Sequence, residues 1–334
     1  MAFERARLKN DFGDPVGEAR ACREKSAVFD FSFLECVRLS GPGARTVVET
    51  FVRRPLDKLA RGAIAYAVRT DPSAAAVADL TVWRIETDVY EVMSGRREDV
   101  TALLAGTSAE VEVVNLGEGR AVFALQGPEA LNVLRQLGDV DGLASLPYFH
   151  FARVELAGAN CTVGRLGYTG EAGFEIVVPR ADAPRVWDEL SRRARPAGFI
   201  AIDMLRIEAG FVLFDNEFRL SVSPAETGLA QFYTGQNTHE ISLKLISFVA
   251  EADDLSAPWV ANGVLERPSQ KGVIAVTSAC HSIAAKGVLG LGFVTASTAD
   301  NAMLEDPSRQ FRNIRRTQLP FYDTSKRRPR LPWR

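Results

Sequence analysis

The sequence predicts an α+β protein built from a duplicated split-βαβ plan and followed by a small all-β domain. Three observations predict this fold class. Two strand–turn–helix units share one pattern, short alternating strands lie between them, and the pattern changes after about residue 240. With 334 residues the chain is long enough for two or three domains.

The repeated unit begins with a short apolar strand and continues through a Gly-Pro turn into an amphipathic helix. Residues 36–42 give the first strand and turn, and residues 121–128 give the second. The helices that follow carry apolar residues at helical spacing, up to Val52 in the first unit and Leu137 in the second. We expect the proline of each turn at the first helical position, where its missing N–H costs nothing.

The other elements follow from periodicity and from the positions of breaking residues. Strands are expected over residues 64–68, 80–85 and 90–93, and helices over 97–104, 184–194 and 200–211. Later apolar runs, separated by Gly, Pro, Ser and Asn, predict the all-β domain; they span residues 241–250, 273–276 and 287–294.

Composition excludes several classes of protein. Hydrophobic residues make up 46% of the chain and charged residues 25%, with a net charge of −2, so no general electrostatic field favours nucleic acid. Four scattered cysteines and three scattered histidines predict neither a disulfide framework nor a metal site. No apolar run suggests a secretory signal or a membrane span, so we expect a cytoplasmic protein. The basic stretch 309–334 is expected to be a solvated tail.

The most informative segment is Gly-Tyr-Thr-Gly-Glu-Ala-Gly-Phe-Glu-Ile, residues 167–176. Its glycines allow unusual backbone angles and the close approach of a ligand. Glu171 and Glu175 lie four residues apart and can accept hydrogen bonds from a flat heterocycle rich in donors. A hairpin turn with two solvated acids is the alternative.

This segment resembles the signature of the T-protein of the glycine cleavage system, a tetrahydrofolate-dependent aminomethyltransferase. Other segments resemble that family in the same order. They are Phe-Asp-Phe-Ser at 29–32, two Gly-Pro segments at 40–44 and 125–130, and Asp-Met-Leu-Arg-Ile-Glu-Ala-Gly at 203–210. The resemblance extends from about residue 20 to about residue 300, more loosely toward the C-terminus.

The resemblance implies two α+β domains and a C-terminal β-barrel around a central folate channel. The expected first domain joins residues 1–50 to residues 116–235, and the second spans residues 51–115. Residues 236–334 would form the barrel and its basic tail.

The resemblance also suggests site residues. Asp79 lies in Val-Ala-Asp-Leu-Thr-Val-Trp, which is similar to the family segment that holds its catalytic aspartate, so Asp79 is the catalytic candidate. A polar residue at the start of a strand is the alternative. The folate-binding candidates are Tyr66 and Tyr168 as ring walls, Glu171 and Glu175 as partners of the pterin ring, and Arg206 as a supporting ion pair. Either tyrosine could equally belong to the core, and Arg206 to a structural salt bridge.

At three places the chain departs from the family pattern. Phe33-Leu34 replace a His-Met pair, Met93 replaces an asparagine, and Ile202 replaces an arginine. Each change removes a polar group that could touch folate or substrate. Within the family, these changes favour a demethylase-like or uncharacterised donor over a lipoyl-bound aminomethyl group.

The expected function is therefore a tetrahydrofolate-dependent one-carbon transferase. It would move a methyl or aminomethyl carbon from a small donor to N5 of tetrahydrofolate, with a lipoyl carrier protein as a further partner. A non-enzymatic folate-binding protein of iron–sulfur cluster assembly is the first alternative, but its family motif has a cysteine where this chain has Phe232. A degenerate paralogue that lost folate is the second.

Overall fold

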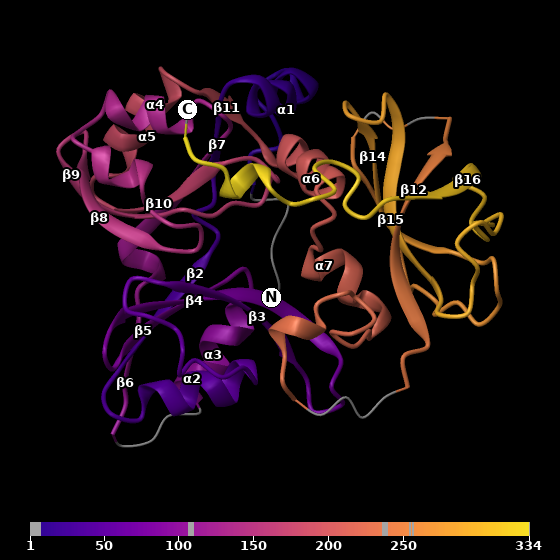
Figure 1. Cartoon of the computed structure of the whole chain (residues 1–334), viewed down its shortest axis with the longest axis horizontal. Helices are drawn as coiled ribbons and strands as arrows, with labels where there is room; N and C mark the ends of the chain where they lie inside the picture. The colour runs from indigo at the N-terminus through magenta and orange to yellow at the C-terminus, as the bar shows by residue number, and fades with distance from the viewer. Residues whose placement is uncertain (1–7, 106–109, 236–239, 254, 256, 334) are drawn as a thin grey trace.

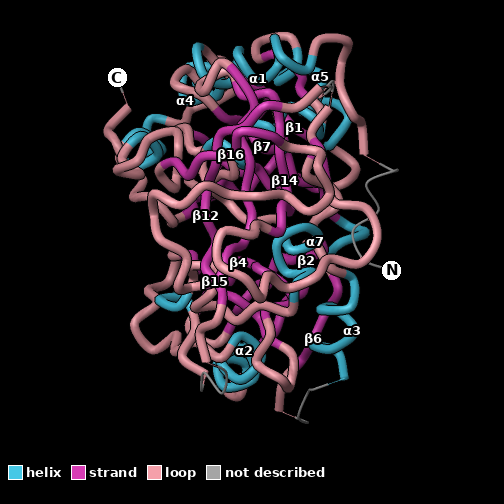
Figure 2. Tube along the Cα trace, turned by 90° about the vertical axis from the view of Figure 1, so that its right-hand side faces the viewer, coloured by secondary structure: helices cyan, strands magenta, loops and turns pink. Residues whose placement is uncertain are grey.

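A computed structural model describes residues 8–105, 110–235, 240–253, 255 and 257–333. Within these residues the chain is α+β, as predicted, and forms three β-sheets (Figure 1). Figure 2 shows α1, α4 and α5 at one end of the molecule and α2 and α3 at the other, with strands between them. No helix in the described part of the chain has both the length and the apolar character needed to cross a membrane.

The first sheet carries the glycine-rich loop. In spatial order its strands are β11, β1, β7, β10, β9 and β8, and only β1 and β11 pair in parallel. The strand bounds are β1 Ala27–Asp30, β7 Arg120–Gln126, β8 Phe151–Leu156, β9 Ala159–Gly164, β10 Gly173–Pro179 and β11 Arg195–Ala197. The accompanying helices are α1 Pro15–Glu24, α4 Ala130–Arg135, α5 Ala183–Ser191 and α6 Phe199–Glu208.

The second sheet is antiparallel throughout, in the order β3-β4-β5-β2-β6. Its elements are β2 Glu35–Ser40, α2 Ala44–Val52, β3 Ile64–Thr70, β4 Ala76–Glu86, β5 Val89–Ser94, α3 Arg97–Ala105 and β6 Glu112–Asn115. Strand β2 pairs with β5 and β6, so it lies in this sheet, although our prediction grouped residues 1–50 with residues 116–235. The division into domains stays a prediction.

The third sheet has the order β13-β14-β15-β12-β16 and is also antiparallel. Its strands are β12 Leu243–Glu251, β13 Trp259–Val260, β14 Ala275–Ser282, β15 Gly287–Thr295 and β16 Arg312–Thr317, and the short helix α7 (Phe214–Glu217) precedes them. Among the described residues the edge strands β13 and β16 do not pair, so the sheet is not closed and the barrel stays a prediction.

Both Gly-Pro turns adopt one geometry. Gly41 and Gly127 have φ of +121° and +127°, and a Cβ at either position would collide with backbone, which explains the glycine. The prediction for the prolines was wrong. Each helix starts two residues after its proline, because a turn closes first, with the N–H of Ala44 or Ala130 donating to the glycine carbonyl. The duplication of whole domains stays a prediction.

Two predicted helices are shorter than expected. The helix expected over 184–194 ends at Ser191, and the helix expected over 200–211 ends at Glu208. Gly210 reverses the chain there with φ of +67°, beyond the last helical residue.

The largest buried cluster lies where the three sheets meet. It takes side chains from each sheet, for example Ala124 of β7, Trp83 of β4 and Phe293 of β15. A second cluster lies on the other face of the first sheet, beneath α4 and α5. Ligand sites occur preferentially at such junctions of structural units.

The C-terminal stretch is not a solvated tail. It runs from β16 back across the first sheet (Figure 1, yellow), where the Trp333 ring stacks on Phe174 with 4.9 Å between centroids. The Arg165 guanidinium donates to the Leu331 carbonyl at 2.6 Å and also faces the Trp333 ring. The prediction failed because it counted the basic residues and overlooked the aromatic ones among them.

Arg206 ties helix α6 to the third sheet and to α7. Its fully buried guanidinium forms ion pairs with Asp203 at 2.6 Å and with Glu217 at 2.9 Å, and donates to Ser278 Oγ of β14 at 2.6 Å. Glu217 also accepts from Thr277 and Ser278 of β14, so its carboxylate is completely bonded. The Asp203 and Glu217 carboxylates raise the pKa of Arg206 against the effect of burial.

Removal of this guanidinium should leave two buried carboxylates without their cation. We expect Arg206→Met to lower the free energy of unfolding by about 3–5 kcal/mol, measured by chemical denaturation. Arg45→Met, at an exposed position on α2, is the matched control and should change stability little. A loss of less than about 1 kcal/mol for Arg206→Met would contradict the assigned role.

Candidate functional site

Tyr66 and Asp79 form a hydrogen-bonded pair on neighbouring strands. The Tyr66 hydroxyl of β3 donates to Oδ2 of Asp79 on β4 at 3.1 Å. Val68 pairs with Asp79 in the ladder, so Tyr66 and Asp79 are diagonal neighbours on one sheet face. On the opposite face of β4, Leu80 and Val82 belong to the core beneath α2. Because side chains alternate between the two faces along β4, the Asp79 side chain lies on the face toward the junction of the three sheets.

The electrostatic setting of Asp79 suits proton exchange near neutral pH. Burial raises its pKa to about 6, and the hydrogen bond from Tyr66 opposes that rise. Burial and the neighbouring Asp79 charge raise the pKa of Tyr66 well above its usual value, so its hydroxyl stays protonated as a donor. A carboxyl with this pKa can hold or release a proton at physiological pH.

Aromatic rings surround the Tyr66–Asp79 pair. The Phe232 ring meets Tyr66 edge-on, with 4.9 Å between centroids. Tyr168 stacks against Phe211 at 5.8 Å, and its hydroxyl donates to the Val212 carbonyl. Burial raises the pKa of Tyr168 well above its usual value; the Arg206 charge opposes that rise, and the negative charge of Asp79 adds to it. The structure thus brings Tyr66, Tyr168 and Asp79 within electrostatic reach of one another.

The glycine-rich loop folds over the buried side chain of Gln126. The Gln126 amide donates to the carbonyls of Leu166 and Phe174 at 3.1 and 3.3 Å, and accepts from the Thr169 hydroxyl at 3.0 Å. Gly167 lies so close that a Cβ there would sit 1.9 Å from the Gln126 oxygen. The loop therefore needs a glycine at position 167, and Gln126 fixes its path between β9 and β10.

Glu175 lies in β10 with its side chain toward the junction. Its neighbours Phe174 and Ile176 pack in the cluster under α4 and α5, so the alternation of the strand turns Glu175 the other way, with Val177. The residue is 8% exposed, and within the described part of the chain no hydrogen bond or ion pair reaches its carboxylate. Burial alone raises its pKa to about 7.

Glu171 has a different setting, in spite of its place in the same motif. Its carboxylate pairs with Arg23 of α1 at 3.1 Å and accepts from the Tyr322 hydroxyl at 2.5 Å. Arg23 also binds Glu208 at 2.7 Å and the Thr169 carbonyl at 2.7 Å. Burial raises the pKa of Glu171, and Arg23 opposes that rise. The Glu171 carboxylate is therefore already bonded to protein groups, and so is the Arg206 guanidinium.

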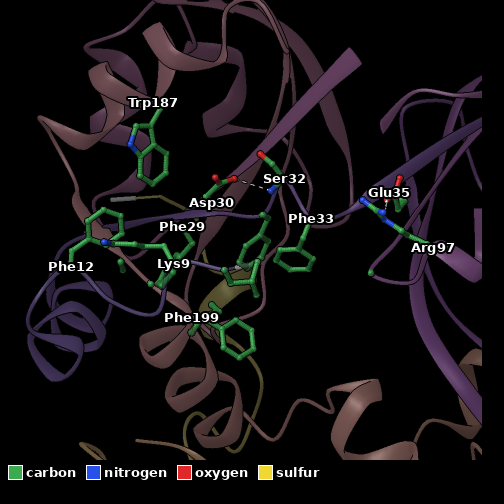
Figure 3. Close-up of a pocket in the computed structure, with 16 residues that line it drawn as sticks. Lys9, Phe12, Phe29, Asp30, Ser32, Phe33, Glu35, Arg97, Trp187 and Phe199 are labelled. Carbon is green, nitrogen blue, oxygen red and sulfur yellow. Dashed lines mark hydrogen bonds and ion pairs between the residues drawn. The ribbon is translucent and has the colours of Figure 1, made fainter. Parts of the chain in front are cut away.

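A cavity of about 550 Å³ opens beside β1 (Figure 3). Its wall includes Phe33 and Ile202, two of the positions at which the sequence departs from the T-protein pattern. Asp79 and Glu175 do not line it. A second cavity, of about 450 Å³, lies beside β14 in the third sheet.

Sequence reasoning missed the supports of the site. Gln126 stood within the recognised Leu-Gln-Gly-Pro segment, yet only the folded loop reveals its bonds. Arg23 and Tyr322, which hold Glu171, come from opposite ends of the chain and carried no local signal.

Residues 6–236 match the family model described as the GCVT N-terminal domain. The chain belongs to this family. The T-protein resemblance of the sequence is thereby confirmed, and the match covers the first and second sheets together with the site residues.

Curated relatives carry the name aminomethyltransferase. The protein of Desulforamulus reducens is 33% identical over 222 residues, which is 64% of this chain and 61% of that protein. The protein of Moorella thermoacetica is 34% identical over 226 residues, 65% of this chain and 62% of that protein. The match thus spans about three fifths of the length of these relatives.

The crystal structure of the glycine cleavage system aminomethyltransferase T from Bartonella henselae has the same fold. It superposes with a TM-score of 0.78, covering 95% of this chain and 92% of that chain at 21% identity. The likeness extends beyond residue 236, so the third sheet shares the arrangement found in that protein.

The unpaired Glu175 predicts a pH-dependent stability. Its folded-state pKa of about 7 exceeds its ordinary value of 4.5, so the folded protein binds the extra proton within this window. Its contribution therefore lowers the free energy of unfolding as pH rises through the window. We expect Glu175→Gln to be more stable than the unchanged protein by about 2–4 kcal/mol at about pH 8, relative to their difference at about pH 5.

Denaturant unfolding at the two pH values measures this difference. Glu112→Gln, on the exposed strand β6, is the matched control and should show no such gain. Equal stability differences for Glu175→Gln at both pH values would show that a partner compensates the Glu175 charge.

Proposed function

We propose that the chain is a tetrahydrofolate-dependent one-carbon transferase of the aminomethyltransferase or demethylase type. The observation that carries the proposal is Glu175, a buried carboxylate that lacks a protein partner and faces the junction of the three sheets. Among the described residues its carboxylate oxygens lack a protein partner and keep access to the surrounding space, so they can accept hydrogen bonds from a ligand that supplies donors. The pterin ring of folate carries donors of this kind, and the aminomethyltransferase name of the relatives supports the choice.

The residues around the junction fit a folate. Glu175 can accept two hydrogen bonds from an amino-pyrimidine edge. Tyr66, Tyr168 and Phe232 offer ring surfaces on which flat rings pack. Tetrahydrofolate supplies a nucleophilic nitrogen, N5, that accepts the one-carbon unit.

Asp79 would act on protons and on the position of the donor. With a pKa of about 6, it can hold a proton or release it close to the reacting atoms. Tyr66 orients this carboxyl through its 3.1 Å hydrogen bond. The protein thereby supplies orientation and a water-poor setting.

The donor is a small molecule in this proposal. A lipoyl carrier protein would be a partner if the donor is a lipoyl-bound aminomethyl group, whereas Phe33, Met93 and Ile202 favour a methyl donor of the demethylase type. A cytoplasmic location is part of the proposal. The accessory role in iron–sulfur assembly receives no support, because Phe232 packs its ring on Tyr66 where that role needs a thiol.

An anaerobic calorimetric titration with tetrahydrofolate tests the proposal directly. We expect a dissociation constant in the micromolar range, about −8 kcal/mol of binding free energy. A lack of binding at millimolar folate would overturn the proposal and favour a degenerate paralogue. Turnover assays with methyl and aminomethyl donors then decide between the two reaction types.

Replacing the catalytic candidate should separate chemistry from binding. We expect Asp79→Asn to abolish turnover and to leave the dissociation constant of tetrahydrofolate nearly unchanged, because the amide keeps the shape but cannot exchange the proton. Single-turnover assays and calorimetry measure the two effects. Asp57→Asn, at an exposed position, is the control, and undiminished turnover of Asp79→Asn would remove Asp79 from the mechanism.

Loss of the Glu175 carboxylate should weaken folate binding. We expect Glu175→Ala to cost about 1.5–3 kcal/mol of binding free energy, the value of hydrogen bonds to a charged group. The variant should fold, since it removes a charge that has no protein partner in the described structure. An unchanged dissociation constant in the same calorimetric titration would exclude Glu175 from the folate site.

A further inference from the structure

A buried amide fills the space beneath the glycine-rich loop. Gln126, the last residue of β7, is 0% exposed. Its side chain passes over Gly173 of β10, where a Cβ would lie 2.6 Å from the amide carbon. Gln126 lies two residues from Ala124, whose side chain packs at the junction of the three sheets, so both side chains lie on that face of β7. The amide therefore lies on the same side of the first sheet as the proposed site.

The Gln126 amide holds the loop at three points. Its nitrogen donates to the Leu166 carbonyl before the loop and to the Phe174 carbonyl after it, at 3.1 and 3.3 Å. Its oxygen accepts from the Thr169 hydroxyl in the middle of the loop at 3.0 Å. Because the side chain both donates and accepts, neither a carboxylate nor an apolar side chain of this length can make the same three bonds. Burial strengthens each bond.

Two residues of the proposed folate site lie beside these points of contact. Tyr168 lies one residue before the Thr169 contact, and Glu175 lies one residue after the Phe174 contact. The strand register makes Glu175 a diagonal neighbour of Gln126 on one face of the sheet. One amide thus sets the positions of a ring wall and of a carboxylate. Because Gln126 is fully buried, it acts through these two residues and not by contact with a ligand.

The Thr169 hydroxyl is the link between this amide and the middle of the loop. It donates to the Gln126 oxygen and accepts from the Glu171 N–H at 3.1 Å. Thr169 is 0% exposed, so the protein groups around it replace water as partners. A valine would keep the shape of this side chain and remove both bonds, whereas a serine would keep the hydroxyl.

We propose that Gln126 is a positioning residue of the folate site, whose amide fixes the separation of Tyr168 and Glu175 and thereby the affinity for the pterin ring. Both residues would have to meet one rigid, flat ligand at the same time. A shift of the loop by about 1 Å would then separate them from the ligand, and such displacements can cost about 100-fold. The inference rests on the proposed function for its ligand and extends it to a residue that lies beneath the site.

Anaerobic calorimetry with tetrahydrofolate tests the proposal on the full chain. Gln126→Met keeps the length of the side chain without its polar atoms, and we expect it to raise the dissociation constant about tenfold or more. Gln126→Glu keeps the shape but loses both amide donors, so it should weaken binding as well. Gln136→Met, at the exposed end of α4, is the matched control and should leave the dissociation constant unchanged.

A second control separates positioning from stability. Val178 lies on β10 with its side chain on the opposite face of the sheet, in the cluster beneath α4 and α5. Val178→Ala should lower the unfolding midpoint, because it removes buried apolar contacts, and should leave folate affinity unchanged. If Gln126 served stability alone, Gln126→Met would behave in the same way, and that result would overturn the inference.

The two Thr169 variants decide the question even if the Gln126 variants do not fold. We expect Thr169→Val to weaken tetrahydrofolate about tenfold and Thr169→Ser to keep the affinity within about twofold. The double variant Gln126→Met/Thr169→Val should bind about as weakly as the weaker single variant, because both changes break one shared bond. Equal affinities of Thr169→Val, Thr169→Ser and the unchanged protein would overturn the inference. A failure of the unchanged protein to bind tetrahydrofolate is a separate result, and it would overturn the proposed function itself.

Discussion

The packing of helices α6 and α7 on the third sheet depends on one buried guanidinium, that of Arg206. Arg206 of α6 binds Glu217 of α7, and both bind Ser278 of β14, so three elements from different parts of the chain share one set of charged hydrogen bonds. A buried charge of this kind tolerates little displacement, because its partners lose their compensation when it moves. Glu217 also accepts from the Leu213 N–H. The Val212 carbonyl, which belongs to the same peptide unit, accepts from the Tyr168 hydroxyl. The network that joins α6 and α7 to the third sheet thus reaches Tyr168, a wall of the proposed site.

Several buried carboxylates of this protein are paired with arginines, and the two acids of the proposed site are not. Glu217, Glu171 and Glu91 are compensated by arginines, and these pairs join separate elements. Among the described residues no cation pairs with Glu175, and Asp79 accepts a hydrogen bond from a tyrosine hydroxyl. Burial raises the pKa of both of these residues toward neutrality. Asp79 and Glu175 thus differ from Glu217, Glu171 and Glu91 in lacking an arginine partner among the described residues.

Local pattern was enough to predict most elements and the α+β class, because strand alternation and glycine turns depend on neighbours in the sequence. The position of Tyr66 against Asp79 required the register of two strands, which the pattern does not contain. Glu171 and Glu175 looked equivalent in the sequence. Since β10 begins at Gly173, only Glu175 takes part in the strand alternation, and Glu171 remains in the loop within reach of Arg23.

The C-terminal stretch has a consequence for the order in which the molecule is completed. Arg165 and Leu331, which it brings into contact, are 166 residues apart along the chain. During synthesis, the strands around the glycine-rich loop emerge long before the segment that covers Phe174. Until then, Phe174 lacks its stacking partner Trp333, although α4 and α5 pack on the same face of the sheet. All strands of the sheet that carries Glu175 are therefore synthesised before the segment that stacks on Phe174.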